Sequence, residues 1–183
     1  MQISFRSLLL PAALLFAGTV HAQRYTDPDT LAPAFPTPQG VVDRMLELAG
    51  LKPGETLYDL GCGDGRIVIT AAQKFKAKAV GVEIRRDIYE STSGRVRSLG
   101  LTDLVKIVHG NALKTNISQA DVVTLYLLTS SNDRLKPVLG TMKPGARVVS
   151  HDFEIHDWKA VTAERMMVGS RPHMIYLYQI RGK

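Results

Sequence analysis

The stretch "LYDLGCGDGRIVIT", residues 57–70, limits the possible folds of this 183-residue chain more than any other feature. Its first part, residues 57–60, has the composition of a buried strand, and glycines follow at alternate positions 61, 63 and 65. The apolar residues of the next segment, 66–75, recur at helical spacing. A strand that passes through a glycine turn into a helix is a common way to receive a nucleotide-like ligand. The stretch therefore predicts a strand, a binding turn and a helix.

The same alternation continues along the chain. Further strands are predicted at residues 79–84, 105–108, 122–128 and 148–150, and further helices at residues 38–49, 87–98 and 133–139. Thr37 precedes the first helix and is predicted to cap it. Two short strands at residues 165–168 and 174–180 suit a closing antiparallel hairpin. The pattern predicts an α/β fold with a single doubly wound, mostly parallel seven-stranded sheet and helices on both faces.

Residues 1–22 have the composition of a secretory signal peptide. Arg6 precedes an apolar stretch at residues 8–20, which is short for a membrane span, and small or permissive residues stand at positions 20 and 22. We therefore expect an exported domain, periplasmic or secreted, with membrane association if the segment is uncleaved. The proline-rich residues 23–37 are expected to form an extended arm, and residues 38–183 the folded domain.

The charge pattern says little about partners. The formal net charge is +6, which gives a mild bias towards anionic partners. The basic residues are scattered, however, and no basic stripe with interleaved aromatic residues is present. A nucleic-acid groove is therefore not predicted.

Ligands of parallel α/β sheets bind at the carboxyl ends of the strands, so the residues there are candidates for a binding site. The first strand end carries Asp59, Gly61, Cys62, Gly63, Asp64 and Gly65. A dinucleotide fingerprint would place its third glycine at Arg66, one position later than in this chain. That spacing, with Asp59 ahead of it, argues against a pyrophosphate and favours a ligand with a cationic or amine-bearing group. A purely structural turn is the alternative.

The second and third strand ends add nucleoside-binding candidates. Glu83, with Ile84 beside it, can accept hydrogen bonds from both ribose hydroxyls, although a surface charge is the alternative. Arg85 follows the strand end and is expected to face water. Asn111 and Ala112 could meet an adenine ring, the first through its amide and the second by leaving room, although such an asparagine is more often a turn residue.

Several segments together resemble a known superfamily. "LKPGETLYDLGCGDG", followed by "GVEI" and "GNA", resembles the class I S-adenosylmethionine-dependent methyltransferases, which have a Rossmann-like fold. The resemblance implies S-adenosylmethionine as cofactor, with Asp59 and the glycine loop near its amino acid group. Glu83 would then lie at the ribose and Asn111 at the adenine.

A finer resemblance covers residues 35–180. "PTPQGVVDRMLELAGL", "GDGRIVITAA", "VVTLYLL" and "RVVSHDFEI" are similar to the small lysine methyltransferases of the ATP synthase subunit c and adenine nucleotide carrier type, which have prokaryotic relatives. A protein lysine is the implied acceptor. The chain departs from the eukaryotic pattern at Cys62, where serine is expected.

Two strand ends are expected to flank the transferred methyl group. Tyr126 could hold the lysine amine or cage it, although a packed core aromatic is the alternative. Asn132 could orient the amine, and Asp152 could take its proton or attract its charge. These three residues are the catalytic candidates.

Other chemistry is not predicted. No carboxylate or cysteine cluster has metal-ligand spacing around His151 and His156, so no metal site is expected. A small residue in a glycine turn explains Cys62 without nucleophilic chemistry. Two alternatives to lysine methylation remain: methyl transfer to a small molecule or nucleic acid, and a non-catalytic module that binds S-adenosylmethionine.

Overall fold

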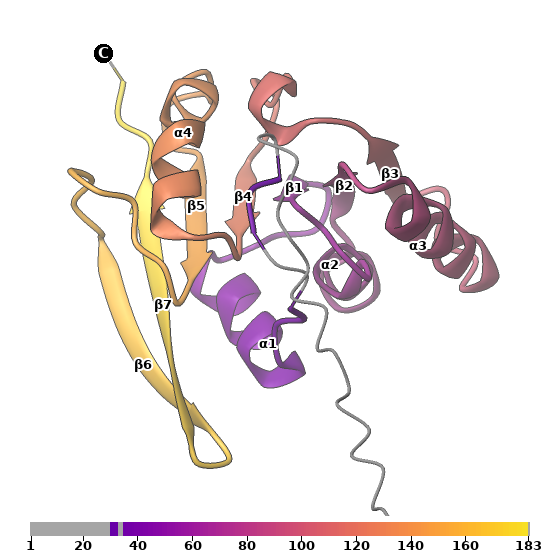
Figure 1. Ribbon diagram of the computed structural model, residues 1–183, viewed down its shortest axis with the longest axis horizontal. Helices are drawn as coiled ribbons and strands as arrows, with labels where there is room; N and C mark the ends of the chain where they lie inside the picture. Colours follow the sequence, from indigo (N-terminus) through magenta and orange to yellow (C-terminus); the bar gives the residue numbers. More distant parts are fainter. Residues whose placement is uncertain (1–29, 33–34, 183) are drawn as a thin grey trace, which may run out of the picture.

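One seven-stranded sheet organises the chain in the computed structural model, which describes residues 30–32 and 35–182 (Figure 1). The proposed signal peptide and much of the arm lie outside the described residues, so export stays a prediction. The strand order is β3-β2-β1-β4-β5-β7-β6. The first five strands pair in parallel, whereas β7 pairs antiparallel with both β5 and β6. This confirms the predicted fold and its closing hairpin.

The elements lie close to their predicted positions. The strands are β1 (Thr56–Leu60), β2 (Lys78–Glu83), β3 (Val105–His109), β4 (Val122–Leu125), β5 (Arg147–His151), β6 (Thr162–Val168) and β7 (Arg171–Gln179). The helices are α1 (Gln39–Leu48), α2 (Arg66–Phe75), α3 (Arg86–Ser98), the short 3₁₀ helix η1 (Ala112–Lys114) and α4 (Thr129–Leu139).

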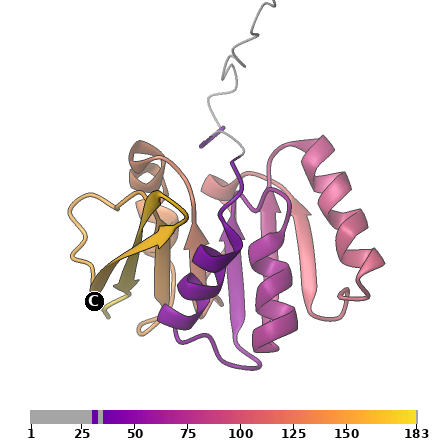
Figure 2. The ribbon, with the colours of Figure 1, turned by 90° about the horizontal axis from the view of Figure 1, so that it is seen from below.

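Helices cover both faces of the sheet (Figures 1 and 2). The helices α1, α2 and α3 lie on one face, and η1 and α4 lie on the other. The apolar stripe of α1 is fully buried because it packs against α2 and the β5–β7 part of the sheet. In the described part of the chain, no helix has the length and apolar character needed to cross a membrane. Two apolar cores, one on each face of the sheet, hold the helices against it. They also fix the position of the edge where the parallel strands end.

The loop after β1 packs directly onto β2. The backbone N–H groups of Gly61 and Cys62 donate to the carbonyl of Val82 at 2.9 and 3.0 Å. A Cβ atom at Gly81 would lie 2.7 Å from Cys62 Sγ and 2.9 Å from Cys62 Cβ, so only glycine leaves room for this loop. Burial raises the pKa of the Cys62 thiol well above its usual value. Cys62 is therefore a packing residue here and not an activated nucleophile.

The connection after β4 differs from its sequence-based prediction. The strand stops at Leu125 instead of residue 128, and α4 begins four residues before the predicted position 133. The carbonyl of Leu128 accepts hydrogen bonds from the N–H groups of Ser131 and Asn132, which starts the helix early. The apolar run predicted as one long strand therefore continues beyond β4. Leu127 in this continuation is buried and lies over Gly61, whereas Leu128 is exposed.

Thr37 also departs from its predicted role. It does not cap α1, where Pro38 is the N-cap and no side-chain cap is present. Its hydroxyl lies 3.2 Å from Nδ1 of His151, which is fully buried at the end of β5. This long-range contact binds the arm to the sheet in place of the local cap.

The fit of the glycine loop on β2 can be tested with Gly81→Ala. We expect this change to lower the free energy of unfolding by about 1–3 kcal/mol, because the new methyl group overlaps Cys62 near its backbone. Gly94→Ala is a matched control within α3, where the nearest atom to the added Cβ lies 3.9 Å away. Its higher helix propensity should raise stability by about 0.5–1 kcal/mol. Urea denaturation measures both, and equal effects would contradict the packing argument.

Candidate active site

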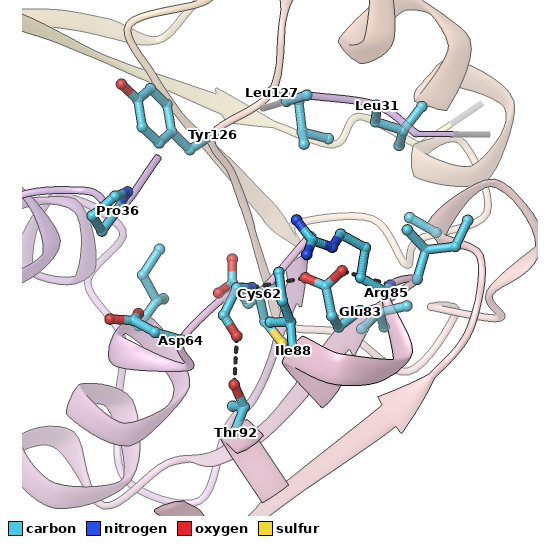
Figure 3. Close-up of a pocket in the computed structure, with 18 of the residues that line it drawn as sticks. Leu31, Pro36, Cys62, Asp64, Glu83, Arg85, Ile88, Thr92, Tyr126 and Leu127 are labelled. Carbon is cyan, nitrogen blue, oxygen red and sulfur yellow. Dashed lines mark hydrogen bonds between the residues drawn. The ribbon is translucent and has the colours of Figure 1, made fainter. Parts of the chain in front are cut away.

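A cavity of about 680 Å³ opens at the carboxyl edge of the sheet (Figure 3). Its size suits a small organic ligand such as a nucleoside derivative. Nine of the residues that the sequence predicted for the site line this cavity: Asp59, Gly61, Cys62, Gly63, Asp64, Glu83, Ile84, Ala112 and Tyr126. Four others do not line it: Gly65, Asn111, Asn132 and Asp152. The strand ends thus assemble most of the predicted site in one place.

The glycines of the loop have different tasks. Gly61, Gly63 and Gly65 have φ values of 86°, 52° and 75°, in the left-handed region that favours glycine. A Cβ at Gly65 would lie 2.6 Å from Thr92 Cγ2, so this glycine allows α3 to approach. A Cβ at Gly63 would meet no atom within 4 Å, so its backbone is open to an approaching ligand. The hydroxyl of Thr92 donates to the Gly63 carbonyl at 2.7 Å and so holds the loop in place. Thr92 was not among the residues predicted for the site.

Glu83 holds the loop and also faces the cavity. Its Oε2 accepts from the N–H of Gly63 at 3.1 Å, and its Oε1 accepts from the N–H of Arg85 at 2.9 Å. Each carboxylate oxygen has a second lone pair, so both can still accept a hydrogen bond from a ligand hydroxyl. This geometry fits the predicted position at a ribose.

Asp59 makes the floor of the cavity electronegative. It is buried and accepts a hydrogen bond from Thr124 Oγ1 at 2.8 Å. Burial, with smaller contributions from the charges of Glu83 and Asp64, raises its pKa to about 7. A cationic ligand group nearby would favour the ionised form. The carboxylates of Asp59 and Glu83 therefore fit the ammonium and sulfonium charges of S-adenosylmethionine better than a pyrophosphate.

Asp64 is engaged at the rim of the cavity. It forms an ion pair with Arg66 at 2.6 Å, and Arg66 in turn donates to the carbonyl of Thr37 at 2.7 Å. Burial opposes ionisation of Asp64, but the hydrogen bonds from Arg66 lower its pKa overall. Asp64 therefore ties the glycine loop to the arm.

The third strand end places its two candidates differently. The side chain of Asn111 accepts from the N–H of Leu113 at 2.8 Å and caps η1, and Asn111 is not part of the cavity lining. Ala112 lines the cavity as expected, as do the apolar residues Ile84 and Ile88. The alternative prediction for Asn111 was a residue that stabilises a turn, and its side-chain oxygen has that role.

Two features of the cavity wall were not anticipated. Arg85 is exposed to solvent, as expected, but it also lines the cavity beside Glu83 (Figure 3), and it pairs with Asp87 at 2.6 Å. The described part of the arm forms the opposite wall, where the hydroxyl of Ser131 donates to the carbonyl of Leu31. Sequence signals for the arm indicated only extended chain, because its partners are distant in sequence.

Tyr126 lines both the main cavity and a smaller one of about 300 Å³, as do Phe35 and Pro36. The smaller cavity is lined by Phe35, Pro36, Pro38, Tyr126, Val168, Arg171 and His173. The Tyr126 ring contacts the His151 ring in a tilted arrangement, with a centroid distance of 3.9 Å and an interplanar angle of 33°. Burial, followed by the nearby charge of Asp152, raises the pKa of the Tyr126 phenol. Its hydroxyl is therefore neutral and can both donate and accept a hydrogen bond.

The other two catalytic candidates are engaged within the protein. Asn132 is fully buried, and its amide nitrogen donates to Ser150 Oγ and to the carbonyls of Phe153 and Glu154, at 3.1–3.2 Å. It stabilises the turn after β5 and lines neither cavity. Asp152 accepts from the N–H of Met174 at 2.9 Å, and its other oxygen lies between two histidines.

The strand order and the cavity at the strand ends define a Rossmann-like, S-adenosylmethionine-dependent methyltransferase. The family model of the ANTKMT methyltransferase domain matches residues 59–162. The chain therefore belongs to the ANTKMT methyltransferase domain family, and it is a methyltransferase.

Individual relatives agree with this family. A protein-lysine N-methyltransferase of Saccharolobus islandicus is 47% identical over 81% of this chain and 93% of its own length. The mouse adenine nucleotide translocase lysine N-methyltransferase is 29% identical over 77% of this chain and 60% of the mouse protein. A crystal structure titled as an RNA methyltransferase from Salinibacter ruber, in complex with S-adenosyl-L-homocysteine, has 43% identity and a TM-score of 0.77, and covers 81% of this chain and 95% of that one.

Glu83→Gln tests the ribose position. We expect S-adenosylmethionine affinity to fall roughly tenfold to a hundredfold, because a hydrogen bond to a charged group contributes about 1.5–3 kcal/mol. Isothermal titration calorimetry measures the change. Glu90→Gln is the matched control, since Glu90 pairs with Arg86 on the outside of α3. Similar losses in both variants would place the ribose elsewhere.

Asp59→Asn tests the charge on the cavity floor. Because the pKa of Asp59 is raised to about 7, the folded protein keeps a proton that the unfolded chain has lost above about pH 4. The contribution of Asp59 to the free energy of unfolding therefore falls, by up to about 4 kcal/mol, as the pH rises from 4 to 7. We expect Asp59→Asn to remove this part of the pH dependence, measured by urea denaturation of the ligand-free protein at pH 5 and pH 8. Asp103→Asn, which removes an exposed carboxylate, should leave the dependence as in the wild type.

Proposed function

We propose that the protein transfers methyl groups from S-adenosylmethionine to lysine side chains of a protein substrate. The observation that carries this proposal is that Tyr126 lines both the main cavity and a smaller one, four of whose seven lining residues are apolar. Four apolar residues of the smaller cavity, Phe35, Pro36, Pro38 and Val168, suit the aliphatic stem of a lysine, whose amine would then reach Tyr126. The protein-lysine N-methyltransferase from S. islandicus, at 47% identity, supports the same acceptor.

The chain's own residues hold and orient the reactants. When bound, S-adenosylmethionine supplies an electrophilic methyl group on a sulfonium. Glu83 and the glycine loop would position the cofactor, and the arm would exclude water from one side of the cavity. Most of the rate gain then comes from alignment, since methyl transfer needs little covalent help from the protein.

The acceptor amine makes one further demand. A lysine amine has an unperturbed pKa of about 10.4, so it must lose a proton before it attacks. It becomes cationic again as it is methylated, so a tyrosine ring and a nearby carboxylate stabilise the product-like transition state. Tyr126 would supply the ring, and Asp152, which lines neither cavity, is near enough for its charge to raise the pKa of the Tyr126 phenol. Asn132 would act only indirectly, through the turn that it stabilises.

Transfer to RNA is the second candidate, and a specific comparison favours it. The S. ruber structure, at 43% identity, is titled as an RNA methyltransferase. Arg171 in the smaller cavity and the net charge of +6 would also suit an anionic polymer. We favour lysine because four of the seven residues that line that cavity are apolar and suit an aliphatic stem, and because the S. islandicus relative, at 47% identity, is named a protein-lysine N-methyltransferase.

Labelled methyl transfer distinguishes the acceptors. The protein is incubated with labelled S-adenosylmethionine and separate protein and RNA fractions of an extract, and the labelled residue is identified by mass spectrometry. We expect label on lysine. Label on RNA alone would support the second candidate, and tight cofactor binding with no transfer would indicate a non-catalytic module.

Tyr126→Phe tests the position of the amine in the same assay. We expect turnover to fall about twofold to tenfold through the loss of one hydrogen bond, with cofactor affinity nearly unchanged. Tyr89→Phe is the matched control, since Tyr89 lies on α3 outside both cavities and stacks on His109. A loss of cofactor affinity without a loss of turnover would assign Tyr126 to the cofactor instead.

A further inference from the structure

Three potential ligand atoms converge behind Tyr126. His151 Nε2 lies 2.8 Å from His173 Nδ1, and both nitrogens lie 3.2 Å from Asp152 Oδ2. The two histidines are almost fully buried, at 0% and 3% exposure. Within the described residues, this is the group of histidine, cysteine and acidic side chains whose geometry could hold a metal ion.

Hydrogen bonds cannot satisfy all three contacts. Each imidazole nitrogen has one site in the ring plane, which holds either a proton or a lone pair. If only one nitrogen is protonated, the lone pair of the other faces the carboxylate oxygen. If both are protonated, the two N–H groups face each other at 2.8 Å. With Asp152 ionised, every assignment of protons to the two imidazoles therefore leaves one side of the triangle repulsive, whereas a cation at its centre would attract all three atoms.

The surroundings prepare the atoms for this task. The Nδ1 of His151 lies 3.2 Å from the Thr37 hydroxyl, so a proton on that nitrogen can be donated there and leaves the Nε2 lone pair free. The second oxygen of Asp152 accepts from the N–H of Met174 at 2.9 Å, which orients the carboxylate. Asp152 also has a left-handed backbone with a φ of 59°, which its backbone hydrogen bond to the Met174 carbonyl helps to hold.

We propose that His151, Asp152 and His173 bind a divalent first-row transition metal such as Zn²⁺. Ligand atoms about 2.0–2.1 Å from such an ion lie roughly 2.9–3.4 Å apart, from right-angled to tetrahedral arrangements. The observed separations of 2.8–3.2 Å match this range with little rearrangement. Two imidazoles and one carboxylate are also a common ligand set for these metals, with a further position left open.

The site has an entry path and a mechanical consequence. His173 lines the smaller cavity, so an ion can reach the triangle from there. The ion would link the end of β5 to β7. It would also hold the orientation of the His151 ring, which contacts the Tyr126 ring. This inference does not depend on which acceptor is methylated. A bound ion would offset the charge of Asp152, so in the metal-bound protein the Tyr126 ring, and not this carboxylate, would stabilise a cationic amine.

Zinc titration tests the proposal. The untagged protein is treated with chelator and titrated with ZnCl₂ by isothermal calorimetry, and Co²⁺ absorption reports the coordination geometry. We expect one ion per chain, visible absorption typical of a low-coordinate Co²⁺ site, and a higher melting temperature with zinc. Asp152→Asn is the main variant because asparagine is almost isosteric and tolerates a left-handed backbone. It should lower the affinity at least about tenfold, as should His173→Ala.

The control is His156→Ala, which removes a more exposed histidine that contacts Asp133 at 2.7 Å. Zinc binding should be unchanged in this variant. Circular dichroism verifies that Asp152→Asn is folded. The proposal is overturned if the wild type binds no stoichiometric zinc, if Asp152→Asn binds it as well as the wild type, or if His156→Ala abolishes binding.

Discussion

The contact between the glycine loop and β2 is the constraint on which the rest of the site depends. Gly61 and Cys62 share the carbonyl of Val82, and Gly81 leaves the space that Cys62 fills. This contact brings the loop to Glu83, which accepts from the N–H of Gly63. Asp59, Glu83 and the start of α2 are therefore positioned by one close approach of the backbone of the loop to β2.

Charge is distributed unevenly in a way that total composition does not reveal. The chain is basic overall, with a formal charge of +6, but the cofactor cavity collects the carboxylates of Asp59, Asp64 and Glu83. A low-dielectric floor makes the charge of Asp59 costly in the absence of a cation. Ligand binding and ionisation of this group are thus coupled, which favours a positively charged cofactor over neutral nucleosides.

Local patterns predicted the sheet and most of the cofactor cavity because these depend on short segments. Short-range patterns determine the strand, glycine turn and helix at residues 57–75. They also place an acidic residue, Glu83, at the end of the next strand. The sequence did not reveal contacts between distant segments. Thr37 bonds His151 across 114 residues, and Thr92 reaches the Gly63 carbonyl across 29. Likewise, His173 meets His151 only because β7 pairs with β5, so spacing along the chain showed no ligand cluster.

The position of β7 has a consequence for how the chain is made. β7 follows β6 in sequence but lies between β5 and β6 in the sheet. A chain emerging from the ribosome can assemble the five parallel strands first, but β6 has no partner in the sheet until β7 has emerged as well. Until then the edge of β5 is unpaired, and His173 is not beside His151. During synthesis, the residues that line the main cavity can therefore assemble before β6 and β7, whose residues complete the smaller cavity.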